Sequence, residues 1–165
     1  MEEDEKWMAQ ALRLAECAYE SGEVPIGCVI VKDGRAIGKG YNQVETLKDS
    51  TAHAEVLAIG AASGALENWR LDGATLYVTL EPCPMCAGAI LNSRISRLVY
   101  GSPDARFGAC GTCSDVLTGN SLSREVKVEG GVQAESSLML IRSFFQEMRA
   151  KKGDSGKKPG SCGVD

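Results

Sequence analysis

The central stretch Thr75-Leu-Tyr-Val-Thr-Leu-Glu-Pro-Cys83-Pro-Met-Cys86 joins an apolar run directly to a pair of cysteines. Residues 75–80 are rich in β-branched and aromatic side chains, which predicts a strand. Residues 84–93 are apolar almost all round, which predicts a short buried helix. We therefore expect both cysteines to lie where this strand gives way to this helix.

Helices and strands alternate on both sides of this stretch. The pair Asp33-Gly34 between two short apolar runs predicts a β-hairpin, and Ser50 or Thr51 is the predicted N-cap of the helix that follows. The remaining predicted elements are helices over 2–21, 53–64 and 134–150, strands over 26–31, 35–41, 97–100 and 125–128, and a loop over 102–123. Strands separated by helices predict an α/β domain of three layers, α-β-α, with a mixed central sheet.

The composition is that of one globular domain. The chain has 165 residues, of which 44% are hydrophobic and 24% charged, and this length can bury a core without disulfides. The domain is predicted to cover residues 1–152, and the Gly-, Ser-, Lys- and Pro-rich residues 153–165 are predicted to be a disordered tail. No apolar run approaches the roughly 18 residues of a membrane span, and the acidic N-terminus is unlike a secretory signal. We therefore expect a cytoplasmic protein with no membrane partner.

Charge is distributed unevenly along the chain, whose net charge is −4. Residues 1–93 hold 7 basic and 14 acidic side chains, whereas residues 94–165 hold 11 basic and 8 acidic ones. This balance excludes a wholly basic protein that binds nucleic acid without specificity. A local basic face remains compatible with it. Arg149 and Lys151 on the last predicted helix are candidates for RNA contact, with an ordinary solvated face as the alternative.

Cysteine and histidine carry the chemical information. The chain has seven cysteines and one histidine, His53. An odd number of cysteines without an export signal favours metal binding or reduced thiols over a disulfide framework. Cys83 and Cys86 can offer two thiolates to one ion, and His53 can supply a third ligand. Zinc prefers this mixture of nitrogen and sulfur, and three protein ligands leave a fourth position for water, as in a catalytic site.

Glu55 lies two residues after His53, in the first turn of a predicted helix. From that position its carboxylate can reach the water on the metal, take a proton from it and return the proton to a substrate. Zinc with two thiolates and a neutral imidazole has no net charge. We therefore expect the N-termini of the two helices to strengthen the acidity of the metal centre.

A structural zinc site is the alternative for the cysteines. Cys110 and Cys113 form a second Cys-x-x-Cys pair, and four cysteines in this pattern often bind structural zinc. However, 23 residues separate the two pairs, against about 15–20 in the usual pattern, and this alternative gives His53 and Glu55 no role. We expect Cys110 and Cys113 to be free thiols in a loop, and Cys17 and Cys28 to lie in the core.

The two motifs together resemble the signature H-x-E…P-C-x-x-C of the zinc nucleobase deaminases. The flanking sequence is similar to that of the bacterial tRNA adenosine deaminases over roughly residues 4–150. The stretches that carry this resemblance are Glu23–Gly27, Gly40–Asn42, Thr51–Glu55, Leu76–Ala89 and Asp104–Gly111.

This resemblance implies a cytidine-deaminase-like fold, a homodimer, and one catalytic zinc held by His53, Cys83 and Cys86. It implies that the adenosine at the wobble position of a tRNA anticodon arm is converted to inosine by addition of water at C6, with loss of ammonia. Glu55 would shuttle the protons, and Asn42 matches a residue that contacts the target nucleotide. Arg106 stands where bacterial members commonly have lysine, which keeps the charge and changes the hydrogen-bond geometry.

Two other functions remain open from the sequence. Deaminases of free bases or nucleosides such as guanine or cytosine share both motifs. An interaction module stabilised by zinc, without turnover, would need the same cysteines. The basic second half of the chain and residues 104–111 favour RNA as the substrate.

Overall fold

The computed structural model describes residues 2–155, which fold into five helices and five strands. Their bounds are α1 (Glu2–Glu20), β1 (Gly27–Lys32), β2 (Arg35–Tyr41), α2 (Val44–Leu47), α3 (Ala54–Leu66), β3 (Thr75–Leu80), α4 (Pro84–Asn92), β4 (Arg97–Ser102), β5 (Lys127–Gly130) and α5 (Ala134–Ser155). Among these residues, no helix is both long and apolar enough to cross a membrane.

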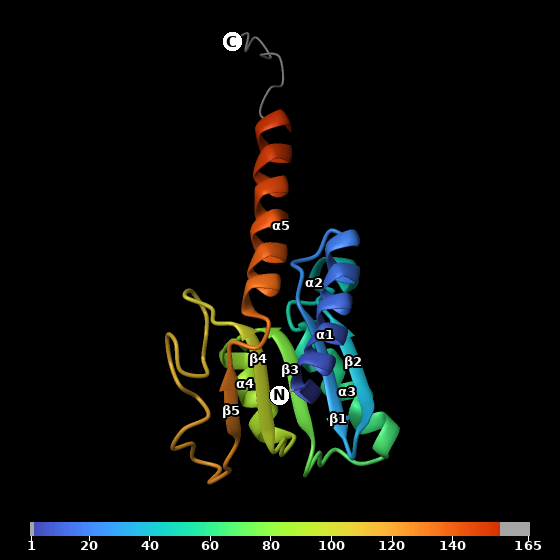
Figure 1. Ribbon diagram of the computed structural model, residues 1–165, viewed down its shortest axis with the longest axis vertical. Coiled ribbons are helices and arrows are strands. Elements are labelled where there is room, and N and C mark those ends of the chain that lie inside the picture. The colour runs from blue at the N-terminus through green and yellow to red at the C-terminus, as the bar shows by residue number, and fades with distance from the viewer. Residues whose placement is uncertain (1, 156–165) are drawn as a thin grey trace, which may run out of the picture.

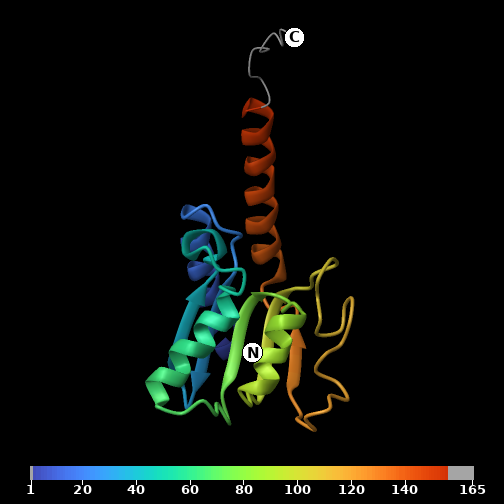
Figure 2. The same ribbon diagram turned by 180° about the vertical axis from the view of Figure 1, so that it is seen from behind.

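The strands form one mixed sheet in the order β2-β1-β3-β4-β5. β1 is antiparallel to β2 and β3, whereas β3, β4 and β5 are parallel. Helix α1 and the start of α5 cover one face (Figure 1), and α3 and α4 cover the other (Figure 2). The predicted α-β-α architecture with a mixed sheet is therefore confirmed.

The local predictions are mostly confirmed, with small shifts. Asp33 and Gly34 both adopt positive φ angles, 51° and 73°, and join β1 to β2 as the Asp-Gly pair predicts. The edge strand begins two residues later than expected, and α2 is a single turn that no sequence pattern indicated. Helix α5 runs to Ser155, five residues past its predicted end. The predicted tail therefore begins inside this helix, and its residues 156–165 lie outside the described part of the chain.

Two local predictions are wrong. The N-cap of α3 is His53 and not Ser50 or Thr51, because the side chain of Asp49 accepts hydrogen bonds from the N–H and Oγ1 of Thr51 and closes a separate turn. Cys28 lies in the core, but Cys17 is exposed.

The N-terminal helix is fastened to the sheet by charge as well as by apolar packing. Trp7 and Met8 pack on the face formed by β1, β3 and β4. Beside them, the carboxylate of Asp4 accepts two hydrogen bonds of 2.7 Å from Arg97 on β4 and one of 2.8 Å from the hydroxyl of Tyr77 on β3. The arginine lowers the pKa of Asp4, so this carboxylate is charged and paired at neutral pH.

Two glycines on β2 allow α3 to lie directly against the sheet. A Cβ atom on Gly40 would lie 2.5 Å from the carbonyl oxygen of Ala54, and one on Gly38 would lie 2.4 Å from that of Ala58. Real Cβ atoms do not approach backbone so closely. The close approach fixes the first turn of α3, and with it the position of His53 and Glu55.

We expect Gly40→Ala to lower the free energy of unfolding by about 1–3 kcal/mol, because the added methyl group forces α3 away from β2. Gly60→Ala is the matched control, since Gly60 lies on α3 with no atom within 4 Å of an added Cβ. That change should raise stability by about 0.5–1 kcal/mol. Urea unfolding of the three proteins measures both effects, and equal stability of Gly40→Ala and the parent chain would contradict the packing argument.

Candidate active site

Three side chains that can ligate a metal meet beside the C-terminal end of β3. His53 is the N-cap of α3 and Cys83 is the N-cap of α4, and both have extended backbones, with φ of −74° and −73°. Cys86 follows in the first turn of α4. The N-termini of two helices therefore face the same point, as the sequence predicted, and their dipoles favour negative charge there.

The distances fit a tetrahedral zinc ion. Nδ1 of His53 lies 3.6 Å from Sγ of Cys83 and 3.5 Å from Sγ of Cys86. Zinc–sulfur bonds of about 2.3 Å and zinc–nitrogen bonds of about 2.1 Å at tetrahedral angles give a nitrogen–sulfur separation of about 3.6 Å. All three ligand atoms lie within 4.8 Å of one another, and no other group of three or more such residues occurs in residues 2–155.

The surroundings favour the thiolate form of Cys83, which is the form that binds a metal. The thiol of Cys86 donates a hydrogen bond to Cys83, and together with His53 it lowers the pKa of Cys83 to about 4, although burial opposes this. The same interaction and burial raise the pKa of Cys86. The hydrogen bond with Cys83 raises the pKa of His53. The cluster thus stabilises a thiolate at Cys83 even before a metal neutralises it.

Glu55 is a buried carboxyl group at this cluster. Its exposed fraction is 4%, and it lies beside Cys86. Burial raises the pKa of Glu55, so the group holds a proton more readily than a carboxyl group in water. A buried carboxyl next to the ligands of a metal can accept a proton from water and donate it to a substrate.

Asn42 lies close in the fold to the start of α3. It follows β2, is buried, and donates its backbone N–H to the carbonyl of Ile26. The next residue, Gln43, donates to the carbonyl of Ala52, which directly precedes His53. The structure therefore brings Asn42 to the same side of the domain as the ligand cluster.

Arg106 also lies near the cluster, although it is exposed. It belongs to the long connection between β4 and β5. The backbone N–H of Ala109 in this connection donates a 2.9 Å hydrogen bond to the carbonyl of Pro82, the residue before Cys83. The connection that carries Arg106 is therefore attached to the turn before Cys83, and the RNA contact of Arg106 stays a prediction.

Arg149 and Lys151 are not brought together with these residues. Both are exposed on the C-terminal half of α5, and this half projects away from the sheet (Figures 1 and 2). The cause is the direction of α5, whose contacts with β3, β4 and α1 include the packing of Phe144 on Tyr19 at a ring distance of 5.8 Å.

Two further buried carboxyl groups were not among the functional residues predicted from the sequence. Glu23 and Glu81 have exposed fractions of 1% and 2%. Glu23 accepts hydrogen bonds from the backbone of Glu45 and Thr46 and from the hydroxyl of Thr46. A charged residue directly after a buried strand is the only signal that could have indicated Glu81, because its partners are distant in sequence.

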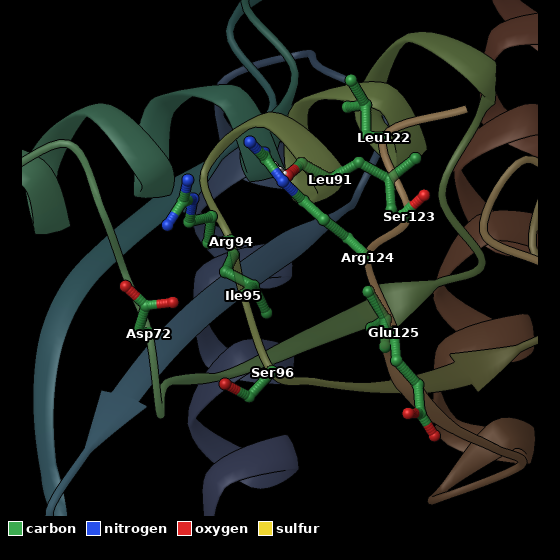
Figure 3. A pocket seen from close by; sticks show the side chains of 10 residues that line it. Asp72, Leu91, Arg94, Ile95, Ser96, Leu122, Ser123, Arg124 and Glu125 are labelled. Atoms are coloured by element: carbon green, nitrogen blue, oxygen red, sulfur yellow. Dashed lines mark hydrogen bonds between the residues drawn. The ribbon is translucent and has the colours of Figure 1, made fainter. Parts of the chain in front are cut away.

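The cavity in Figure 3 lies at the other end of the sheet. It has a volume of about 420 Å³ and is lined by Asp72 and Ser96, which precede β3 and β4, and by Leu122 and Arg124. The guanidinium group of Arg124 donates to backbone carbonyls of Leu91 and Asn92 at the C-terminus of α4. This cavity is therefore separate from the ligand cluster.

The second cysteine pair does not join the cluster. Cys110 is buried, and Cys113 is exposed with its sulfur 3.1 Å from the carbonyl of Ala105. The four-cysteine alternative is therefore not supported by the described part of the chain.

Residues 1–102 match the family described as the cytidine and deoxycytidylate deaminase zinc-binding region. The chain is 46% identical to the tRNA-specific adenosine deaminase of Bacillus subtilis, over 92% of this chain and 94% of that protein. It is 45% identical to that of Haemophilus influenzae, over 90% and 87% of the two chains.

Solved structures agree with these relatives. A structure from a study of tRNA:A34 deaminases that edit A to I at the wobble position superposes with a TM-score of 0.77 at 44% identity, covering 82% of this chain and 98% of that one. A guanine deaminase from Nitrosomonas europaea reaches a TM-score of 0.74 at 25% identity, covering 85% and 83%. With its His-Cys-Cys cluster at zinc distances, the chain belongs to the zinc-binding cytidine and deoxycytidylate deaminase family, in the branch of the tRNA-specific adenosine deaminases.

Proposed function

We propose that this protein is a zinc-dependent enzyme that converts the wobble adenosine of a tRNA anticodon arm to inosine. The observation that carries the proposal is the cluster itself, in which three metal ligands at zinc distances lie beside a buried carboxyl group. The identity of 46% to a tRNA-specific adenosine deaminase over 92% of the chain supports adenosine in tRNA over a free base.

In this proposal His53, Cys83 and Cys86 hold one catalytic zinc. When bound, the ion would act as a Lewis acid and would lower the pKa of a water molecule that it binds. The dipoles of α3 and α4 stabilise the two thiolates at their N-termini. The half-buried imidazole ring of His53 completes a ligand set that needs no further residue of the chain.

Glu55 moves the protons of the reaction. Its carboxylate accepts a proton from the attacking water and donates one to N1 of adenine, which makes C6 more electrophilic. It then accepts the proton of the new hydroxyl group on C6 and donates it to the amino group, so that the C6–N bond breaks, ammonia leaves and C6 becomes a carbonyl carbon. The raised pKa of Glu55 suits both directions of transfer near neutral pH.

Asn42, Arg106, Arg149 and Lys151 are proposed contacts for the RNA. Asn42 would contact the target nucleotide, and Arg106 a neighbouring phosphate or base. Arg149 and Lys151 on the projecting half of α5 would reach RNA only outside the reacting loop. A single-stranded loop suits this enzyme because its bases leave the stack at low cost.

We further propose a homodimer that acts in the cytoplasm, where tRNA is found, with residues 1–152 as the deaminase domain. Exposed apolar side chains on α5 support association between chains. Met139, Phe145 and Met148 have exposed fractions of 67%, 39% and 38%.

Incubation with an anticodon arm that carries a wobble adenosine, followed by sequencing for inosine, tests the function. We expect inosine at this position only. Parallel reactions with free guanine, cytosine and adenosine test the alternative substrates. Turnover of a free base without reaction of the arm would replace this proposal by a free-base deaminase.

We expect one zinc ion per chain, measured by elemental analysis of the purified protein. Cys83→Ala, Cys86→Ala and His53→Ala should each lose most of the metal, because two remaining ligands hold zinc weakly. The double change Cys110→Ser with Cys113→Ser is the control and should retain one zinc. Loss of zinc in this control, with retention in His53→Ala, would reverse the ligand assignment.

We expect Glu55→Gln to retain zinc and much of the RNA affinity while its single-turnover rate falls by about 10⁴ or more, the upper end for one acid–base group. Glutamine has nearly the same shape but cannot accept and return a proton. Glu67→Gln is the matched control, since Glu67 is an exposed residue at the opposite end of the same helix, and its rate should be unchanged. A fall of less than about tenfold for Glu55→Gln with full zinc occupancy would assign the proton transfer to another group.

A further inference from the structure

Glu81 is a buried carboxylate whose two oxygens both accept hydrogen bonds from one loop. Its two oxygens accept hydrogen bonds from the backbone N–H groups of Asp104, Cys110 and Thr112, at 3.2, 3.0 and 3.2 Å, and a fourth from the hydroxyl of Thr112. These donors lie 23 to 31 residues away in the sequence. One side chain thus binds both ends of the segment 104–112.

The same segment is fastened to the turn that carries the metal ligands. Glu81 is two residues before Cys83, and the N–H of Ala109 donates to the carbonyl of Pro82 between them. Gly108 packs so tightly that a Cβ atom would lie 2.6 Å from Oε2 of Glu81. The segment and the metal turn therefore form one rigid unit.

This rigid unit holds an aromatic ring in solvent. Phe107 has an exposed fraction of 61%, and the guanidinium group of Arg106 lies 5.7 Å from its ring centre. The side chain of Asp104 accepts the backbone N–H groups of both Arg106 and Phe107. An exposed phenylalanine gains nothing from burial here, and its backbone N–H is nevertheless held by the side chain of Asp104.

We propose that Glu81 is a positioning residue for RNA, which holds Phe107 next to the metal centre so that its ring stacks on an unpaired base beside the target adenosine. This inference rests on the proposed function, because it needs a substrate with a base on at least one side of the reacting one. In this proposal the segment 104–112, and not the metal ligands, selects RNA over a free base.

The chemistry of the pair suits a single-stranded RNA. Unpaired bases are bound by stacking on aromatic rings, and arginine adds attraction to phosphate and to the base plane. Stacking does not depend on the identity of the base. A loop whose backbone is already fixed loses little entropy on binding, and the hydrogen bonds to Glu81 fix this loop on both sides of Phe107.

Steady-state kinetics with the zinc-loaded full chain and the anticodon arm test the ring. Phe107→Ala should raise KM about tenfold, the usual order of one base–aromatic stack, with kcat and zinc content unchanged. Phe107→Trp should restore the KM, whereas Phe107→Leu should not, because it keeps the apolar character and loses the ring. Leu122→Ala is the matched control. Leu122 is another exposed apolar residue of the same connection (46% exposed) and lies at the cavity of Figure 3, and its KM should not change.

Glu81→Gln tests the positioning role. Glutamine keeps one acceptor oxygen but turns an NH₂ group toward backbone donors, so we expect KM to rise about fivefold, the order of one lost hydrogen bond, with zinc retained. If Glu81→Gln does not fold, Thr112→Val is the second variant. It removes the hydroxyl group that donates to Glu81 without changing any charge, and it should also raise KM. The double variant Glu81→Gln with Phe107→Ala should resemble Phe107→Ala alone, because the two residues act through one contact.

Three results would overturn the proposal. The first is an unchanged KM in Phe107→Ala, and the second is multiplication of the two single effects in the double variant. The third is a loss of zinc from Glu81→Gln that accounts for its loss of activity. If the parent chain makes no inosine, the proposed function fails, and fluorescence anisotropy with the same arm still decides this inference. Weaker binding by Phe107→Ala but not by Phe107→Trp supports it, and equal binding by all three proteins refutes it.

Discussion

His53 and Cys83 are separated by 30 residues, and their ligand atoms lie 3.6 Å apart. Two helices must begin at the same edge of the sheet for this to occur. Helix α4 does so because it follows β3 directly, whereas α3 reaches the position because Gly38 and Gly40 admit its backbone against β2. This meeting of two helix N-termini places the three metal ligands together. It also places Glu55, in the first turn of α3, beside them.

Three buried glutamates around this point show how surroundings decide what one residue type does. Burial raises the pKa of Glu23, but hydrogen bonds from Thr46 and Glu45 outweigh it and lower the pKa. Glu81 accepts hydrogen bonds from the backbone N–H groups of Cys110 and Thr112. Glu55 lies among sulfur atoms and apolar groups, and burial raises its pKa. The first two therefore serve as fixed anchors for loops, and the third is suited to carry a proton.

Relatives with this fold act on different substrates. A guanine deaminase shares this fold at 25% identity and a TM-score of 0.74, while the tRNA-specific relatives reach 46%. The fold therefore does not choose the substrate. In this chain the loop held by Glu81 is the part of the site surroundings that carries an exposed aromatic ring.

Local sequence patterns were enough to predict the helices and strands and the chemistry of the metal centre. Strand and helix periodicity, the Asp33-Gly34 turn, the single histidine and the spacing of Cys83 and Cys86 are signals that report backbone preference and ligand type. Tertiary structure decided which distant groups meet. The side chain of Asp49 accepts the hydrogen bonds of Thr51, so that His53 is the N-cap of α3 in place of Thr51. Glu81 accepts hydrogen bonds from a loop more than twenty residues away in the sequence. The course of α5 carried Lys151 away from the centre. No periodic pattern records such pairings, because they depend on how separate elements pack and not on any one of them.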